Sequence, residues 1–302
     1  MGIGKNKIIL NKLLNNILPI MEFEKYHALG NDYLVFDPKG KDITFSEKEI
    51  IRICHRNFGL GSDGILLGPT SSDQANYKLR ILNPDGSEAE KSGNGLRIFA
   101  RYLRDIKEVS TQPFQVETLG GIVSCQVSED KSVIIVEMGK VSFHSDKIPV
   151  NVKGKSREVC DETIEVDGKS LQYYAATIGN PHCVVPVENA NQALAMELGS
   201  GLENHSNFPN RTNVQFLQII DRNRIKIEIW ERGAGYTLAS GSSSSAAGAV
   251  ARKMGACDES ITVEMPGGEI GLLIDDEFNV QMTGPATRVA TMELDEECIE
   301  GT

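Results

Sequence analysis

Two short segments of this 302-residue chain share one pattern of residues. One is Ser92-Gly-Asn-Gly followed by Leu-Arg-Ile-Phe-Ala-Arg, and the other is Ser240-Gly-Ser-Ser followed by small and apolar residues. In each segment a serine and a glycine precede a run with helical periodicity, which indicates a helix N-terminus. The free amide groups of such a terminus bind carboxylates and phosphates. Two of them predict a pseudo-symmetric site that holds one anionic substrate from both sides.

The remaining sequence has the order of a duplication. Each half contains strand-like runs, a first helix, further strands and then a longer central helix. In the first half the central helix should extend from Ser92 to about Arg104, and in the second half helices should lie near 190–198 and 240–254. The apolar face of the first central helix comprises Leu96, Phe99, Ala100 and Leu103. We therefore predict an α+β fold of two pseudo-symmetric halves.

The same pattern divides the chain into three stretches. Residues 1–20 should be an extension outside the fold, residues 21–145 the first half and residues 146–302 the second half, because Gly139, Pro149 and Gly154 interrupt the pattern between them. The extension alternates Lys and Asn with Ile and Leu and has no small-residue cleavage site, which disfavours a secretory signal. A surface amphipathic helix is the alternative interpretation.

Composition excludes several classes of partner. The formal charge is −11, and the first twenty residues contribute lysines but no acid, so the rest of the chain should repel nucleic acid. There is no apolar run of the roughly 18 residues that a membrane helix needs. The six cysteines are scattered singly, which favours reduced thiols over a metal site or a redox pair. We expect a cytoplasmic protein without a membrane or nucleic-acid partner.

Eight short motifs follow one another between Met21 and about residue 292. They are His27–Asp32 (HALGND), Arg56–Gly64 (RNFGLGSDG), Asn83–Glu88 (NPDGSE), Ser92–Gly95 (SGNG), Gly179–His182 (GNPH), Arg211–Asn213 (RTN), Glu231–Gly235 (ERGAG) and Thr237–Gly241 (TLASG). In this order they resemble the diaminopimelate epimerase family. The resemblance implies that each half is a curved, mostly antiparallel sheet wrapped around its central helix. It also implies a cofactor-independent isomerase that converts LL- to meso-diaminopimelate in lysine and peptidoglycan precursor synthesis.

The catalytic pair is where this sequence departs from that family. The family uses two cysteines as base and acid on opposite faces of the α-carbon, and here Ser92 and Ser240 occupy their places. A thiol ionises near pH ~8.5 and a hydroxyl is a far weaker acid, so a serine that abstracts a proton needs an adjacent base. The resemblance places His182 and Glu231 beside the reacting centre as helpers. We expect a two-site epimerase whose activity the serine pair impairs.

The resemblance also assigns residues to substrate binding. The two ends of the amino acid fall to side chains that both donate and accept hydrogen bonds or carry charge, and its α-carboxylate falls to backbone amides. The side chains are Asn31, Asn83, Asn180, Asn213 and the pair Glu231 and Arg232; the backbone groups belong to Gly93, Asn94, Gly241 and Ser242. The expected partner is therefore a small amino acid, with no metal or cofactor. A homodimer is the default expectation for assembly.

Two other functions fit the same residues. A one-base isomerase or dehydratase would use Glu231 or His182 as its base, with Ser92 and Ser240 only donating hydrogen bonds. A non-catalytic amino-acid-binding protein would keep the cleft after loss of the catalytic pair. The sequence also leaves open whether the two serines are natural or were introduced, because the six cysteines that remain fit both explanations.

Overall fold

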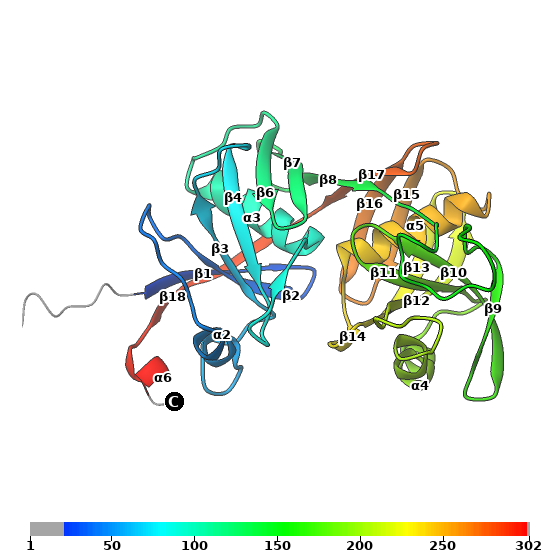
Figure 1. Cartoon of the computed structure of the whole chain (residues 1–302). Helices are drawn as coiled ribbons and strands as arrows, with labels where there is room; N and C mark the ends of the chain where they lie inside the picture. Colours follow the sequence, from blue (N-terminus) through cyan, green and yellow to red (C-terminus); the bar gives the residue numbers. More distant parts are fainter. Residues whose placement is uncertain (1–20, 301–302) are drawn as a thin grey trace, which may run out of the picture.

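The computed structural model describes residues 21–300, which form two halves side by side (Figure 1). Within these residues 18 strands join into one continuous sheet. The first half contains β1 (Met21–Ala28), β2 (Asn31–Phe36), β3 (Ile65–Thr70), β4 (Tyr77–Leu82), β5 (Glu88–Ala89), β6 (Phe114–Thr118), β7 (Gly121–Val127) and β8 (Ile134–Lys140). The second contains β9 (Glu162–Val166), β10 (Lys169–Thr177), β11 (Pro181–Pro186), β12 (Asn213–Asp221), β13 (Arg224–Glu231), β14 (Gly235–Thr237), β15 (Ser260–Met265), β16 (Gly268–Ile274) and β17 (Asn279–Gly284). The predicted extension, residues 1–20, lies outside the described residues.

Strand pairing is the same in both halves. β1 and β2 pair antiparallel, β2 and β3 parallel, β3 and β4 antiparallel, β4 and β6 parallel, and β6, β7 and β8 antiparallel. β10 and β11, β11 and β12, β12 and β13, β13 and β15, and β15 to β17 repeat that order with the same directions. This repetition, with mostly antiparallel pairing, confirms the predicted α+β fold of two pseudo-symmetric halves.

Two pairings connect the halves. β8 pairs antiparallel with β17, so the sheet continues from one half into the other. The last long strand, β18 (Thr287–Leu294), pairs with β1 and so belongs with the first half, although the sequence prediction placed it in the second. Its position covers an edge of β1 that would otherwise expose unpaired backbone groups. β9 occupies the matching position beside β10.

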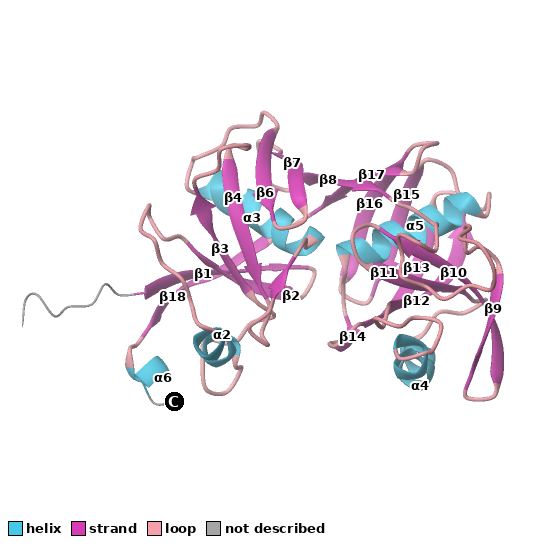
Figure 2. Cartoon of the chain, viewed as in Figure 1, coloured by secondary structure: helices cyan, strands magenta, loops and turns pink. Residues whose placement is uncertain are grey.

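Each half wraps its strands around one central helix (Figure 2). In the first half this is α3 (Gly93–Asp105), whose predicted apolar face, Leu96, Phe99, Ala100 and Leu103, is fully buried. In the second half it is α5 (Gly241–Lys253), which is buried on nearly all sides although serine, alanine and glycine dominate it. The hydroxyls of Ser244 and Ser245 donate to the carbonyls of Ser240 and Gly241, so these buried serines are satisfied within the helix.

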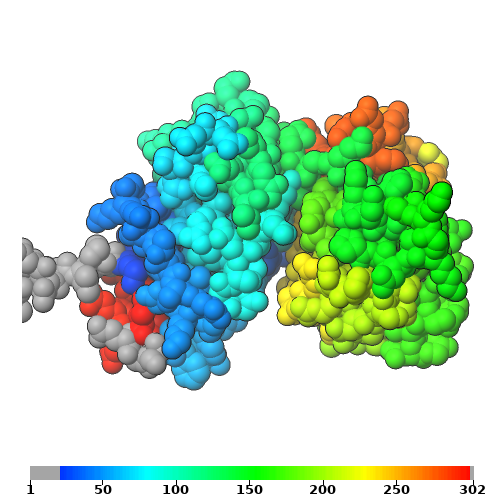
Figure 3. All heavy atoms as spheres, viewed as in Figure 1, coloured from blue at the N-terminus to red at the C-terminus, as the bar shows by residue number. Residues whose placement is uncertain are grey.

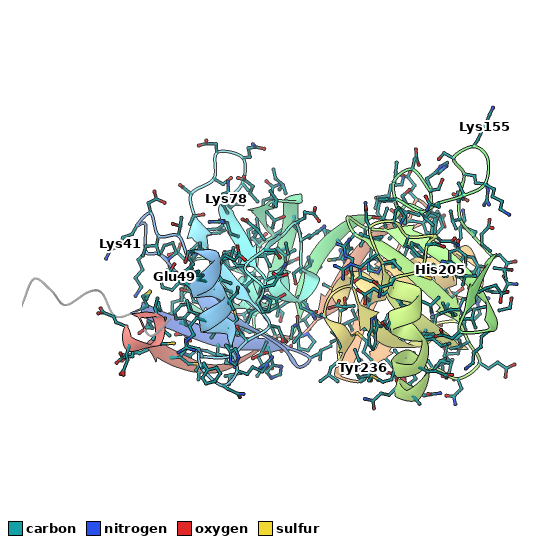
Figure 4. All side chains as sticks on the ribbon, turned by 60° about the horizontal axis from the view of Figure 1, so that its bottom comes forward. Lys41, Glu49, Lys78, Lys155, His205 and Tyr236 are labelled. Carbon is teal, nitrogen blue, oxygen red and sulfur yellow. The ribbon has the colours of Figure 1, made fainter. Side chains whose placement is uncertain are left out.

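Two outer helices cover the halves at matching positions. α2 (Glu47–Cys54) lies between β2 and β3 and begins with a full capping box at Ser46, while α4 (Gln192–Glu203) lies between β11 and β12. Figure 4 shows Glu49 on α2 and His205 just after α4, on the face that comes forward in that view. A short helix, α6 (Glu297–Glu300), follows β18. None of the helices in residues 21–300 has the length and apolar character needed to cross a membrane.

Candidate active site

The N-termini of the two central helices meet between the halves. Ser92 is the N-cap of α3 and Ser240 the N-cap of α5, both with extended backbone. A Cβ atom added to Gly241 would lie 3.1 Å from the Cα of Gly93. A side chain at Gly241 would therefore crowd the backbone of Gly93, and one at Gly93 would crowd the side chains of Met282 and Met138. Figure 3 shows the groove that separates the halves on one face of the molecule.

Ser92 is half-buried and its hydroxyl has two neighbours. The oxygen accepts a hydrogen bond from the backbone N–H of Gly95, 3.0 Å away, which is the usual N-cap contact. The hydroxyl of Tyr33, on β2, lies 3.4 Å from the same oxygen. Because a serine hydroxyl has one proton and two lone pairs, the proton of Ser92 is not used by the cap.

Ser240 is more deeply buried, with 5% of its surface exposed. Its oxygen accepts from the backbone N–H of Ser243 at 3.3 Å and lies 3.5 Å from the hydroxyl of Ser242. Burial raises the pKa of Glu231, at the end of β13, and a hydrogen bond with the Ser240 hydroxyl opposes that rise. A carboxylate with a raised pKa is a stronger base than an exposed one, and this one interacts electrostatically with the Ser240 hydroxyl.

His182, on β11, is linked by hydrogen bonds to the surroundings of this second serine. It is fully buried, and burial lowers its pKa to about 3, with the Gln215 side chain opposing the shift, so the ring is neutral. Its Nε2 atom is 2.9 Å from the side-chain oxygen of Asn180, whose amide nitrogen donates to Ser242 at 3.3 Å. A chain of side-chain contacts thus runs from His182 through Asn180 and Ser242 to Ser240.

Asn94 connects the two helix N-termini. Its amide nitrogen donates to the side chain of Asn31 at 2.9 Å and to the carbonyl of Ala239, in the other half, at 3.1 Å. Its oxygen accepts from Arg97, a fully buried residue whose Nε and Nη1 atoms have no hydrogen-bond partner. Burial lowers the pKa of Arg97 to about 10, which leaves it charged and adds positive potential near the N-terminus of α3.

Asn31 and Asn83, two more of the predicted binding asparagines, make hydrogen bonds to nearby side chains. The Asn31 amide donates to Asp63, and Arg56 pairs with Asp63 and with Asp32. Asn83 bonds to Ser87 within its own turn, which matches the turn signal Asn-Pro-Asp-Gly.

Asn213 fixes the loop that carries the charged pair of the second half. Its side chain accepts from the backbone N–H of Arg232 at 3.0 Å and donates to the carbonyl of Pro181 at 2.9 Å. The side chain of Arg232 is exposed and donates to the carbonyl of Asn210. Buried Glu203 also supports the loop, because it accepts from the backbone N–H of Gly233 and from Trp230 and Arg211.

The structure thus brings together Ser92, Gly93 and Asn94 with Gly241, Ser242 and Ser240, and it places Glu231 against Ser240. Sequence reasoning missed four residues that hold this arrangement: Tyr33, Asp63, Arg97 and Glu203. Asp63 and Arg97 lie inside segments that carry the resemblance or the repeated pattern, whereas Tyr33 and Glu203 lie outside them. Two surface cavities, of about 410 and 480 Å³, are lined by other residues.

Within residues 21–300 no group of three or more His, Cys, Asp or Glu side chains is placed to hold a metal ion. The groups that lie at the helix N-termini are instead two hydroxyls, one partly buried carboxylate and one phenol. Such a set can bind an anionic group on backbone amides and move a proton at a nearby carbon.

Proteins of one family match this chain over most of its length. The sequence profile described as diaminopimelate epimerase matches residues 23–144 and 174–289. A protein named diaminopimelate epimerase 2 from a Nostoc species is 56% identical over 92% of this chain and 96% of its own length. A diaminopimelate epimerase from Desulfitobacterium hafniense is 39% identical over 89% and 96%.

Solved structures with low sequence identity share the fold. A hydroxyproline epimerase from Agrobacterium vitis with bound trans-4-OH-L-proline has a TM-score of 0.68 at 14% identity and covers 93% of this chain and 94% of its own. A phenazine biosynthesis protein of the PhzF family from Bacillus anthracis has a TM-score of 0.61 at 19% identity and covers 91% and 99%.

Proposed function

Because this chain belongs to the diaminopimelate epimerase family, we propose that it interconverts the LL and meso stereoisomers of diaminopimelate by moving the α-proton between opposite faces of the carbon. The chain is an isomerase that acts on amino acids. We also propose that diaminopimelate is the substrate, that the proton moves by a two-site route and that no cofactor takes part. We propose that the reaction takes place in the cytoplasm.

The observation that carries the proposal is the meeting of the two helix N-termini. With Gly93 against Gly241, the free N–H groups of both helices point toward one small volume. An α-carboxylate held there accepts hydrogen bonds from both helices, and its α-carbon then lies between Ser92 and Ser240. The same N–H groups stabilise the negative charge that spreads onto the carboxylate when the α-proton leaves.

Proton abstraction is assigned to the Ser240 side. The Glu231 carboxylate takes the proton of the Ser240 hydroxyl while the Ser240 oxygen takes the α-proton, so one Cα–H bond breaks and one O–H bond forms on Glu231. Asn180 and Ser242 keep the Ser240 side chain in position, and neutral His182 fixes Asn180.

Proton return is assigned to the Ser92 side. The Ser92 hydroxyl gives its proton to the opposite face of the carbon, and the Gly95 N–H already points at the oxygen on which negative charge develops. Exchange with solvent then removes the proton gained by Glu231 and restores the one given by Ser92. The groups assigned to the far end of the substrate are Asn31, Asn83, Asn213 and Arg232.

Turnover in heavy water tests this function. LL- and meso-diaminopimelate are each incubated with the protein in D₂O and followed by proton NMR. We expect each stereoisomer to form the other with deuterium at the inverted carbon, while substrate recovered early stays unlabelled. Return of the same proton to the product indicates a one-base enzyme. Tight binding by calorimetry without turnover of either isomer indicates a binding protein, and either result overturns the proposal.

A further inference from the structure

The hydroxyl of Tyr33 is directed at Ser92 rather than at solvent. Tyr33 has 7% of its surface exposed, and its hydroxyl oxygen lies 3.4 Å from the Ser92 oxygen. Among the described residues, Ser92 is the hydrogen-bond partner of the Tyr33 hydroxyl. The separation is long for an O–H···O contact, but contacts at catalytic groups commonly tighten when substrate binds.

The hydroxyls of two other buried tyrosines in the first half have carboxylate partners. The hydroxyl of Tyr26 donates to Asp105 at 3.0 Å, and that of Tyr102 donates to Asp37 at 3.1 Å. Both phenols therefore have an ionised acceptor, which compensates for their burial. Tyr33 has a neutral hydroxyl instead, in the place where the reaction is proposed to return a proton.

A glycine makes the room for this ring. Gly64 follows Asp63, and a Cβ atom at Gly64 would come within 2.7 Å of the Tyr33 ring and within 2.6 Å of the Leu82 carbonyl. The φ angle of Gly64, +155°, is also one that other residues rarely adopt. The ring of Tyr33 therefore packs against the backbone at Gly64, just before β3, where any side chain would displace it.

We propose that Tyr33 is a positioning residue that supplies a proton to Ser92 while Ser92 protonates the substrate carbon. The inference rests on the proposed epimerase function. In this step the Ser92 O–H bond breaks as the new Cα–H bond forms, and the Tyr33 O–H bond breaks as the Ser92 O–H bond forms again. The phenolate left on Tyr33 regains its proton from solvent.

Charge around Tyr33 keeps it a proton donor. Burial raises the pKa of Tyr33 to about 12, the hydrogen bond with Ser92 opposes the shift, and the negative charges of Glu231 and Asp63 add to it. The phenol is therefore protonated at neutral pH. It remains a stronger acid than an aliphatic hydroxyl, so proton transfer to a developing Ser92 alkoxide is downhill.

The test is a double-mutant cycle between Tyr33 and Ser92. Tyr33→Phe removes the hydroxyl and keeps the ring, and it is made both in this chain and in the Ser92→Cys background. In this chain we expect kcat to fall by about 100-fold, the typical size of a general-acid contribution, with little change in KM. In the Ser92→Cys background the loss should nearly vanish, because a thiolate is stable without a second proton donor.

Tyr102→Phe is the matched control, since it removes a buried phenol that donates to Asp37 and does not contact Ser92. It should leave kcat unchanged, and thermal unfolding of both variants shows whether they fold. Equal losses in the two backgrounds, or no loss in this chain, overturn the role of Tyr33 and leave the epimerase function standing.

Turnover by this chain separates failure of the inference from failure of the function. If this chain turns diaminopimelate over and Tyr33→Phe does so at the same rate, the inference alone is overturned. If this chain does not turn it over, the proposed function and the inference are overturned together, and activity of the double variant Ser92→Cys, Ser240→Cys then shows that the serine pair is the cause.

Discussion

The N-termini of α3 and α5 have the same backbone and different neighbours. Ser92 has φ and ψ of −138° and 117°, and Ser240 has −149° and 124°. Each serine accepts from the N–H three residues on, and each is followed by a glycine at the contact between halves. A phenol lies beside Ser92, whereas a carboxylate with a raised pKa lies beside Ser240. Duplication thus accounts for the geometry of the site, and divergence of neighbouring side chains makes one end acidic and the other basic.

Replacing the proposed base, Glu231, should lower kcat more than any other change at the two helix N-termini. Glu231→Gln keeps the size of the side chain and removes the carboxylate, so we expect kcat to fall by about 1,000-fold, within the usual range for a general base. Steady-state rates measured in both reaction directions check this. Glu197→Gln, which removes an exposed carboxylate, is the control. If both variants lose the same activity, Glu231 is not the base beside Ser240.

The same variant should be more stable than the parent at neutral pH. A carboxyl whose pKa is raised in the folded state stabilises folding when protonated, and that contribution is lost as pH rises through the raised pKa. Glu231→Gln carries no such charge. Its unfolding free energy should exceed that of the parent near pH 7, and the difference should vanish below about pH 4. Urea unfolding at both pH values measures it, and a less stable variant at pH 7 would contradict the assignment.

With cysteine at positions 92 and 240, catalysis should depend less on the phenol beside one residue and the carboxylate beside the other. A thiol ionises far more readily than a hydroxyl, and each pKa unit is worth about tenfold in proton transfer. Ser92→Cys, Ser240→Cys should therefore be at least as active as this chain. It should also depend less on Glu231, which a comparison of Glu231→Gln in both backgrounds measures. Inactivity of the cysteine form beside an active serine form would indicate a mechanism that requires hydroxyls.

Cutting the bridge between the helix N-termini should have a smaller effect. Asn94→Ala removes the contact with Ala239 and leaves buried Arg97 without its partner. A lost hydrogen bond to a buried charge costs about 1.5–3 kcal/mol of stability. We expect that loss in urea unfolding, together with a higher KM. Asn204→Ala, which removes a side-chain hydrogen bond at an exposed helix end, is the control and should change neither.

The smallest expected effect on activity concerns His182, whose contribution is to stability. The pKa of His182 in the folded protein is about 3, below its ordinary value, so its contribution to stability is present above pH ~6.5 and is lost as pH falls toward 3. His182→Gln should therefore lose less stability than the parent between pH 6.5 and 4. Replacing exposed His144 instead should leave that pH dependence as it is in the parent.

Local patterns predicted the parts of the fold that local interactions determine. The N-caps at Ser92 and Ser240 and the repeated order of elements were found because capping and periodicity act over a few residues. The pairing of β18 with β1 was not found, since partners so far apart leave no local signal. The contact of Tyr33 with Ser92 depends on the room that Gly64 leaves for the ring, and Gly64 lies in the loop before β3, far from both residues in the sequence pattern. The fold was therefore more predictable than the chemistry at either helix.

A crystal structure of the protein with bound diaminopimelate tests the central claim most directly. The account predicts that the α-carboxylate accepts hydrogen bonds from the N-termini of both α3 and α5. It also predicts that the hydroxyls of Ser92 and Ser240 approach the α-carbon from opposite faces. A carboxylate bound by one helix alone, or both hydroxyls on the same face of the carbon, would contradict it.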